Sequence, residues 1–208
     1  NLSSKNNFLI KLNKKNQIID FKLSSNLRLN NLYLKNNLKL DEFFPNLRKI
    51  IELRDHSINI KYDKKKFSIK GSGYISLQEK EDDIEYFVSN ENNRYNFETI
   101  LILANNPLKI DFLGYQKKEN SNAKIKINGL FIPKKKIVIN SGFLNENNNS
   151  FNVEKLIFDE TLKVFDLESI KINYQDKSKN NNQLELVKKK DQFYLSGSEF
   201  NADYLVED

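Results

Sequence analysis

Apolar and polar residues alternate along most of this chain. In FKLSSNLRLN (21–30), for example, Leu27 and Leu29 are flanked by polar residues. This period of two is typical of a β-strand with one apolar and one polar face. Similar runs recur at short intervals, separated by polar clusters such as DKKK (63–66) and NENNNS (145–150). Because such short connections suit hairpins rather than parallel crossovers, the pattern predicts one long antiparallel meander.

The alternation changes phase once soon afterwards. In NLRLNNLYLKN, the apolar set moves from Leu27 and Leu29 to Leu32 and Leu34. A shift of one residue turns every following side chain to the other face of a strand. The sequence therefore predicts a bulge or tight turn at Asn30–Asn31, which would keep the apolar set facing the same way.

Two segments depart from the strand pattern. LDEFFPNLRKIIEL places apolar residues at helical spacing behind Asp41, a residue type that caps helices, and predicts a short helix at about 41–53. At the far end, FNADYLVED has Asn201 in a capping position and predicts the start of a helix at 200–208.

The apolar stripes of so many strands need a cover, and one or two short helices are too few to supply it. A second sheet can pack on them as in a β-sandwich, the sheet can close on itself, or it can curl around an apolar ligand. We expect an all-β fold with one or two short helices, in which the antiparallel meander curls into an elongated, taco-like groove; a β-sandwich is the alternative.

The candidate lining residues of this groove are the apolar residues that alternate along the strands. They are Phe21, Leu23, Leu27, Leu29, Leu32, Leu34, Ile58, Ile60, Phe67, Ile69, Leu101, Leu103, Ile110, Phe112, Ile125, Ile127, Ile137, Ile139, Phe151, Val153, Ile170, Ile172, Leu184 and Leu186.

Composition supports an open, polar-surfaced fold. Hydrophobic residues make up only 38% of the 208 residues, whereas aromatic residues reach 12%, more than a disordered chain usually carries. The formal net charge is +6, but the basic residues are almost all lysines interleaved with acids. Nucleic-acid surfaces depend on arginine, so the charge indicates solvated strand faces and turns rather than a nucleic-acid partner.

Lysine-rich tips recur between apolar strands. INIKYDKKKFSIKGSG (58–73), IKINGLFIPKKKIVINSG (125–142) and LELVKKKDQFYLSGS (184–198) share this plan. Two interpretations stay open: hairpin tips in a lysine-rich chain are simply rich in lysine, or several cationic tips lie along a common rim. Lysines at such a rim could attract anionic lipid headgroups.

No motif indicates catalysis, a metal or a cofactor. The chain has no Cys, and its only His, His56, lacks an evident acid partner in the sequence. Ser72 in KGSGYI is followed by a strand pattern, which excludes a nucleophile elbow. The acidic run QEKEDD (78–83) lacks the spacing of a calcium loop. We therefore expect a protein that is not an enzyme.

The residues also resemble a known family. The closing stretch FYLSGSEFNADYLVED, and the combination of NLRLNNLYLKN with FFPNLRKIIELRDHSINIKYDKKKFSIKGSGYI, are similar to the AsmA-like envelope proteins, the group that includes TamB and YhdP. The resemblance covers most of the chain, but it consists of strand patterns with Gly and Asn punctuation. It brings no catalytic residue with it.

The resemblance implies a fold and a role. Residues 1–208, which begin with Asn1 rather than Met, would be a single β-groove segment of a longer protein with flanking β-groove repeats. The groove would carry phospholipid between inner and outer membranes by its acyl chains. The protein would be periplasmic and tethered to the inner membrane by a helix outside this segment. The alternative that the residues leave open is a closed β-sandwich that acts as a scaffold or adhesion module without lipid transfer.

Overall fold

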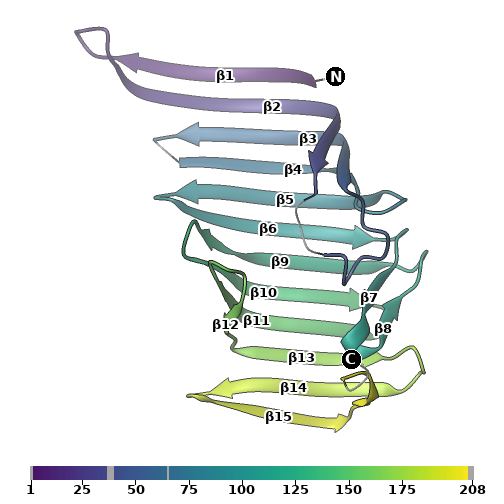
Figure 1. Cartoon of the computed structure of the whole chain (residues 1–208). Coiled ribbons are helices and arrows are strands. Elements are labelled where there is room, and N and C mark those ends of the chain that lie inside the picture. The colour runs from purple at the N-terminus through teal and green to yellow at the C-terminus, as the bar shows by residue number, and fades with distance from the viewer. Residues whose placement is uncertain (1, 37–39, 65, 206–208) are drawn as a thin grey trace.

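The computed structural model describes residues 2–36, 40–64 and 66–205. One open sheet of 13 strands contains most of this part of the chain, and its paired strands run antiparallel (Figure 1). In spatial order, the main path comprises β1 (Leu2–Leu12), β2 (Ile18–Lys35), β3 (Ile50–Asp63), β4 (Lys66–Ser76), β5 (Asp82–Glu91), β6 (Arg94–Leu103), β9 (Ala123–Ile132), β10 (Lys136–Glu146), β11 (Asn149–Asp159), β13 (Ser169–Gln175), β14 (Asn181–Lys189) and β15 (Gln192–Glu199).

The remaining elements are short. β12 (Val164–Asp166) pairs with β11 beside the main path, and β7 (Leu108–Ile110) pairs with β8 (Tyr115–Lys117) in a separate two-stranded sheet. The 3₁₀ turn η1 (Asp111–Leu113) links these two strands, and η2 (Asp203–Leu205) follows β15. The predicted all-β antiparallel meander is confirmed. The described residues form no second sheet of similar size, so the β-sandwich alternative does not apply.

The predicted helix at about 41–53 is wrong. Residues 41–46 form turns, and β3 begins at Ile50. The apolar pair Ile50 and Ile51, which matched a helical spacing, belongs to a strand in which Ile51 is buried and Ile50 is exposed. The predicted helix start at 200–208 is reduced to the single 3₁₀ turn η2 over Asp203–Leu205, and residues 206–208 lie outside the described residues.

The change of phase also has a structural origin. The structure places the bulge in β3 rather than at Asn30–Asn31: Asp55 has a φ of 53°, and the register with β4 shifts between Arg54 and Ser57. The register between β2 and β3 is constant on both sides of this point. Lys155 in β11, with a φ of 50°, marks a second such irregularity. These bulges let a long strand keep its apolar residues on one face.

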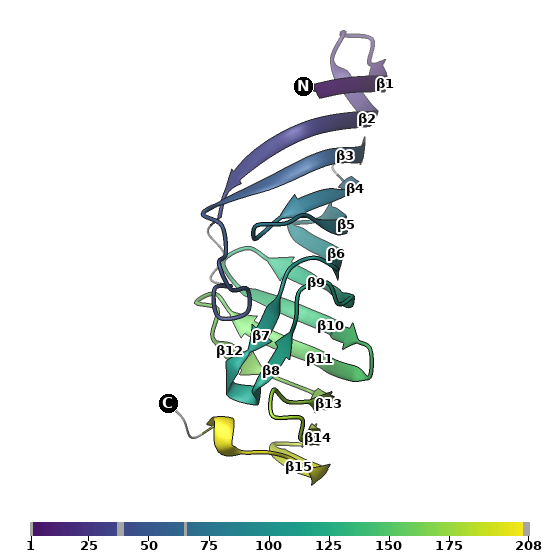
Figure 2. The same ribbon diagram turned by 90° about the vertical axis from the view of Figure 1, so that its right-hand side faces the viewer.

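One end of the apolar face is covered. We call the segment 40–49, β7, η1, β8 and η2 the cover; it crosses the ends of the strands on one side of the sheet, where β2 and β3 also bend (Figures 1 and 2). Phe44, Leu108 and Leu113 of the cover pack with Leu103 and Phe151 of the sheet in one buried cluster. The hydrophobic core therefore lies at one end of the strands rather than along their whole length.

Candidate functional site

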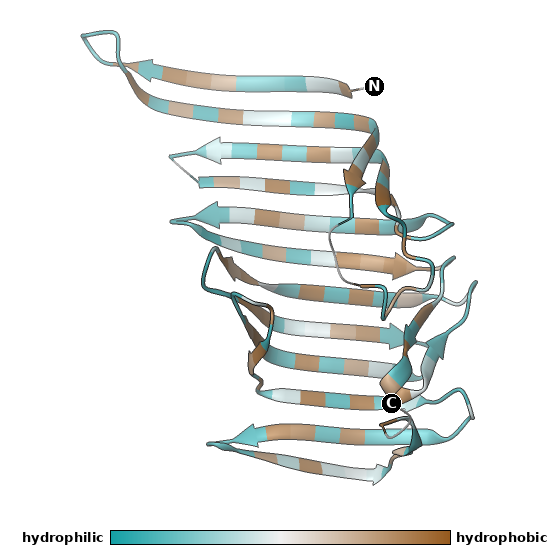
Figure 3. Cartoon of the chain, in the orientation of Figure 1, coloured by the Kyte–Doolittle hydropathy of each residue, from teal (hydrophilic) through white to brown (hydrophobic). Residues whose placement is uncertain are grey.

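The rest of the apolar face stays partly exposed, and we call it the open lane. Cross-strand partners share a face of the sheet, so the register defines which side chains belong to it. Predicted lining residues in the open lane are Phe21, Leu23, Leu27, Leu29, Ile58, Ile60, Phe67, Ile69, Ile127, Ile137, Ile139, Val153 and Leu186, which are half-buried except for the exposed Phe21. Figure 3 shows the alternation of apolar and polar residues along the strands that bear it.

Other predicted lining residues lie elsewhere. Those in or against the buried cluster under the cover are Leu101, Leu103, Ile125, Phe151, Ile170, Ile172 and Leu184. Ile110 and Phe112 belong to the cover itself, at the end of β7 and in η1. Leu32 and Leu34 are exposed near the end of β2. Ile110 and Phe112 thus lie outside the main sheet, whereas Leu32 and Leu34 pair with Leu53 and Ile51 at the cover end of the same apolar face.

Three rows of side chains run across the strands in the open lane. The outer row contains Leu23, Tyr62, Phe67, Asn90, Tyr95, Phe131, Ile137 and Phe158, each paired with the next. The middle row contains Ile60, Ile69, Val88, Phe97, Gly129, Ile139 and Leu156. The inner row includes Leu27, Ile58, Ile127, Val153 and Leu186. The rows also contain the aromatic residues Tyr62, Tyr95, Phe97, Phe131 and Phe158, which share the same alternation but were not among the predicted lining residues.

Aromatic rings make the outer row continuous. The ring centroids of Phe67 and Tyr95 lie 6.1 Å apart, and those of Tyr95 and Phe131 lie 6.0 Å apart. In the middle row, the Phe97 ring lies over Gly129, where an added Cβ would come within 2.7 Å of it. An added Cβ would also clash with the Val138 carbonyl oxygen, so the close approach of ring and backbone requires glycine at this position.

A polar pair interrupts the apolar face near the bulge in β3. His56 is buried, with its Nε2 2.9 Å from the Tyr74 carbonyl oxygen and its Nδ1 3.3 Å from the Tyr86 hydroxyl. Burial raises the pKa of the Tyr86 phenol. Since both His56 ring nitrogens have partners within the sheet, this residue is a structural hydrogen-bonding group.

Buried polar groups hold the cover in place. Tyr115 donates a 2.6 Å hydrogen bond to Glu146, and burial, together with this bond, raises the pKa of the Tyr115 phenol. Lys117 is fully buried and donates to the Asn106 carbonyl oxygen at 2.6 Å; desolvation lowers its pKa. Tyr174 donates to the Leu113 carbonyl oxygen at 2.8 Å. The Tyr115 and Tyr174 bonds fix the cover on the sheet, whereas the Lys117 bond closes the segment 106–117 on itself; no signal in the sequence identified them.

The opposite face of the sheet is mainly polar and contains cross-strand pairs, although apolar side chains such as Leu130, Val138 and Ile157 also lie on it. Asn59 donates to Asn26 at 2.7 Å across β2 and β3, and Lys126 forms a 3.0 Å ion pair with Glu98 across β6 and β9. The sheet thus has one mainly polar face and one mainly apolar face, as the alternation predicted.

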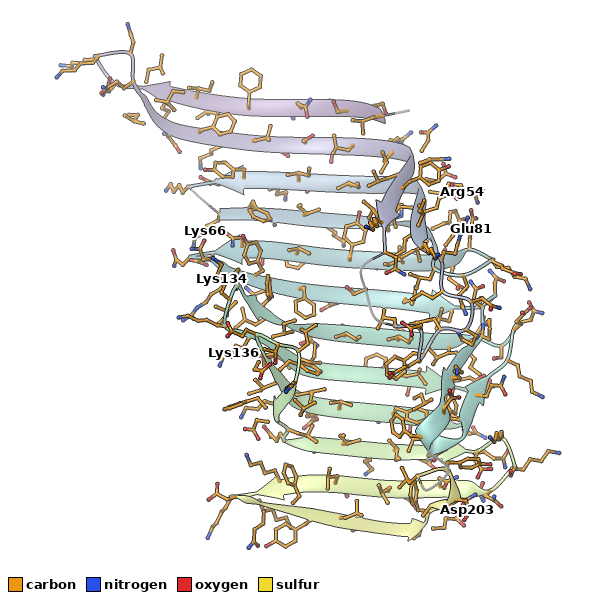
Figure 4. All side chains as sticks on the ribbon, in the orientation of Figure 1. Arg54, Lys66, Glu81, Lys134, Lys136 and Asp203 are labelled. Carbon is orange, nitrogen blue, oxygen red and sulfur yellow. The ribbon has the colours of Figure 1, made fainter. Side chains whose placement is uncertain are left out.

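The two sides of the sheet on which the strands end differ in charge. Hairpin tips gather beside the outer row at one edge, and Figure 4 shows Lys66, Lys134 and Lys136 there, with Arg54 and Asp203 at the opposite edge near the cover. Described cations at the tips beside the outer row are Lys14, Lys15, Lys64, Lys66, Arg94, Lys134, Lys135, Lys136, Lys163, Lys189 and Lys190; the acids there are Asp63, Glu91, Asp159, Glu160 and Asp191. We call this the cationic edge.

The described residues contain no cluster of three or more His, Cys, Asp or Glu side chains that could hold a metal ion. Across residues 2–36, 40–64 and 66–205, we find no helix with the length and apolarity to cross a membrane. Comparison with protein-family models, curated proteins and solved structures gave no significant match. The resemblance to AsmA-like proteins therefore stays a hypothesis that rests on the quoted residues.

Proposed function

We propose that this chain is a non-catalytic phospholipid carrier whose open lane holds acyl chains. The observation that supports this most directly is the extent of the lane. The outer row crosses the sheet from β2 to β11 and the middle row from β3 to β11, while the inner row, interrupted by Gly71, Tyr86, Thr99 and Gly142, reaches β14. Contiguous exposed apolar surface of this extent marks an interaction site in soluble domains. Each ~100 Å² of apolar surface that a lipid removes from water contributes about 2.5 kcal/mol.

The chemistry of the lane suits transport better than tight binding of one molecule. Its side chains are aliphatic and aromatic, with few polar interruptions such as Ser25, Asn90 and Thr99. Hydrogen-bonding groups at fixed positions would select one ligand and one position. A lane with similar contacts at each strand lets an acyl chain move from strand to strand at little cost.

The cellular setting of the proposal comes from the resemblance. An AsmA-like segment would act in the periplasm, joined to flanking β-groove repeats of the same chain and tethered to the inner membrane through another region. Phospholipid would then pass between inner and outer membranes and supply the outer membrane. The polar pairs of the opposite face, such as Asn26–Asn59 and Glu98–Lys126, agree with an aqueous compartment.

A photo-crosslinking experiment tests the lane directly. A photoreactive amino acid at Ile139, in the middle row, should capture phospholipid from vesicles or from the host cell. The matched control is Val138, the neighbouring half-buried aliphatic residue on the opposite face of β10. Capture at Ile139 and at Ile127, but not at Val138, supports the proposal.

The contrary outcome is equally defined. If the folded protein captures lipid at neither Ile139 nor Ile127, or captures it equally at Val138, the open lane is not a lipid site. A scaffold or adhesion role, in which the apolar face is covered by protein, would then replace the proposal.

A further inference from the structure

The charge at the strand ends would orient an amphiphilic ligand in the open lane. The cationic edge adjoins the outer row: Lys134, Lys135 and Lys136 lie between Phe131 and Ile137, which are cross-strand partners in that row. The opposite edge adjoins the cover, and its connections 40–49, 77–81, 104–122 and 176–180, together with the segment 200–205, carry equal numbers of acids and bases. An amphiphile in the open lane therefore meets positive charge at one end of the strands and a closed apolar wall at the other.

The three lysines between Phe131 and Ile137 of the outer row form no ion pair within the described residues. Among the described residues, Lys134, Lys135 and Lys136 take part in no ion pair, whereas Lys66 is paired with Glu91 at 2.6 Å. An unpaired ammonium group beside an apolar surface is available to a phosphate oxygen without first breaking a bond within the protein.

Turn geometry does not account for these lysines. Lys64, Lys134 and Lys190 occupy the left-handed region, with φ of 48°, 57° and 57°. This conformation is unfavourable for most side chains and is better tolerated by Gly or Asn. The chain uses Asn for it at other tips, such as Asn16 and Asn92. Lysine takes this conformation at three tips of the cationic edge and, among the described turns of the opposite edge, at Lys179 alone.

The length of the lane matches one leaflet of a bilayer. In β6, the open lane runs from Tyr95 in the outer row to Thr99 in the inner row, which is four residues or about 14 Å at ~3.4 Å per residue. One leaflet of the hydrocarbon core is about 15 Å thick. An acyl chain that lies along the strands can therefore reach from the cationic edge to the cover.

From these observations we propose that the lane takes anionic phospholipids, with their phosphate groups at the cationic edge and their acyl chains directed toward the cover. This inference rests on the proposed function and specifies the ligand class and its orientation. Neighbouring hairpin tips are separated by two strands, or about 10 Å, so a headgroup meets successive cations as it moves along the sheet. The connection after β11, with Asp159 and Glu160, is the acidic exception.

Monomeric short-chain lipids separate headgroup recognition from attraction to a charged membrane. Calorimetry measures the binding of three compounds to the whole chain: dihexanoyl phosphatidylglycerol, dihexanoyl phosphatidylcholine and glycerol phosphate. The two lipids are titrated below their micelle-forming concentrations. Phosphatidylglycerol should bind about fivefold or more tightly than phosphatidylcholine, since one nearby lysine contributes about that factor. Glycerol phosphate, which has no acyl chains, should not bind measurably.

The variant K134Q/K135Q/K136Q should bring both lipids to within twofold of each other without weakening phosphatidylcholine. K49Q/K118Q/K179Q removes the same charge from exposed residues at the other edge and should keep the preference. Circular dichroism of both variants would check that they fold.

Each contrary result has its own meaning. Equal affinity of the unaltered chain for both lipids, or a preference that survives K134Q/K135Q/K136Q, overturns the headgroup inference and leaves the lipid lane intact. Binding of neither lipid overturns the proposed function and the inference together. Binding of glycerol phosphate as tight as that of phosphatidylglycerol reveals an anion site unconnected with the lane and also overturns the inference.

Discussion

Equal truncations in the buried cluster and in the open lane should have different consequences. Leu103 in β6 is 0% exposed beneath the cover, whereas Leu186 in β14 is half-buried in the inner row. Leu103→Ala should lower the free energy of unfolding by about 3 kcal/mol, because it removes fully buried methyl groups and leaves a cavity. Leu186→Ala should cost about 1 kcal/mol, since its neighbours can be rehydrated.

Bound lipid should change the stability cost of Leu186→Ala but not that of Leu103→Ala. Burying a whole leucine side chain contributes about 1.5–3 kcal/mol, so covering the exposed half of Leu186 adds about 1 kcal/mol that the alanine variant cannot gain. At saturating dihexanoyl phosphatidylcholine, the cost of Leu186→Ala should therefore rise to about 2 kcal/mol. The cost of Leu103→Ala should be the same with and without lipid, because the cover already excludes water from that side chain.

Urea unfolding at fixed lipid concentration measures both effects, since ligand bound to the native state raises its stability. Val187→Ala, on the opposite face of β14, is the control for nonspecific action of lipid on the sheet. A cost for Leu186→Ala that does not change with lipid, or a lipid effect of equal size for Val187→Ala, would refute the assignment of the lane.

Three further predictions concern the cover, the sheet and the lane. Burial raises the pKa of Tyr174 to about 12. The stability that this residue contributes is therefore present below pH 10 and should fall as pH rises toward 12, by up to about 1.4 kcal/mol per pH unit. Tyr174→Phe should flatten this part of the alkaline unfolding profile. Gly129→Ala should cost about 1–3 kcal/mol in chemical unfolding because its Cβ meets the Phe97 ring and backbone, whereas Gly142→Ala, whose Cβ lies 3.7 Å from its nearest neighbour, should change stability by less than about 0.5 kcal/mol. Ile69→Lys should abolish lipid capture in a vesicle-extraction assay, and Ser68→Lys on the opposite face should preserve it; equal losses would contradict the assignment of faces.

The regular part of the fold could be predicted because its signal is local. Strand alternation at Leu27 and Leu29, or at Ile137 and Ile139, reports directly which side chains share a face. The same signal failed at 40–53, where apolar residues satisfied both periodicities over a short stretch. The bulge at Asp55 depends on a left-handed backbone conformation that the presence of an Asp does not predict.

The division of the apolar face into a buried cluster and an open lane could not be predicted. It depends on where the cover packs, and this is determined by contacts between segments distant in sequence. The bond from the Tyr174 hydroxyl to the Leu113 carbonyl oxygen spans 61 residues. Lys117 gives no sign in the sequence that it is buried, because lysine is usually a surface residue. Hence the sequence did not distinguish, among the 24 candidate lining residues, those that the cover buries from those in the open lane.

The cover also has a consequence for cooperativity. In the main sheet, strands contact mainly their neighbours in the chain, which is the arrangement of repeat proteins, where edge units can unfold while the centre stays native. The cover opposes this independence. Lys109 of β7 donates its backbone N–H to the Phe43 carbonyl oxygen at 2.9 Å, and Lys177, beyond β13, donates to the Gly114 carbonyl oxygen at 2.8 Å. A quasi-linear stack is thereby fastened between β2 and β14, so this region should exchange its amide hydrogens as one unit while β1 and β15 exchange ahead of it.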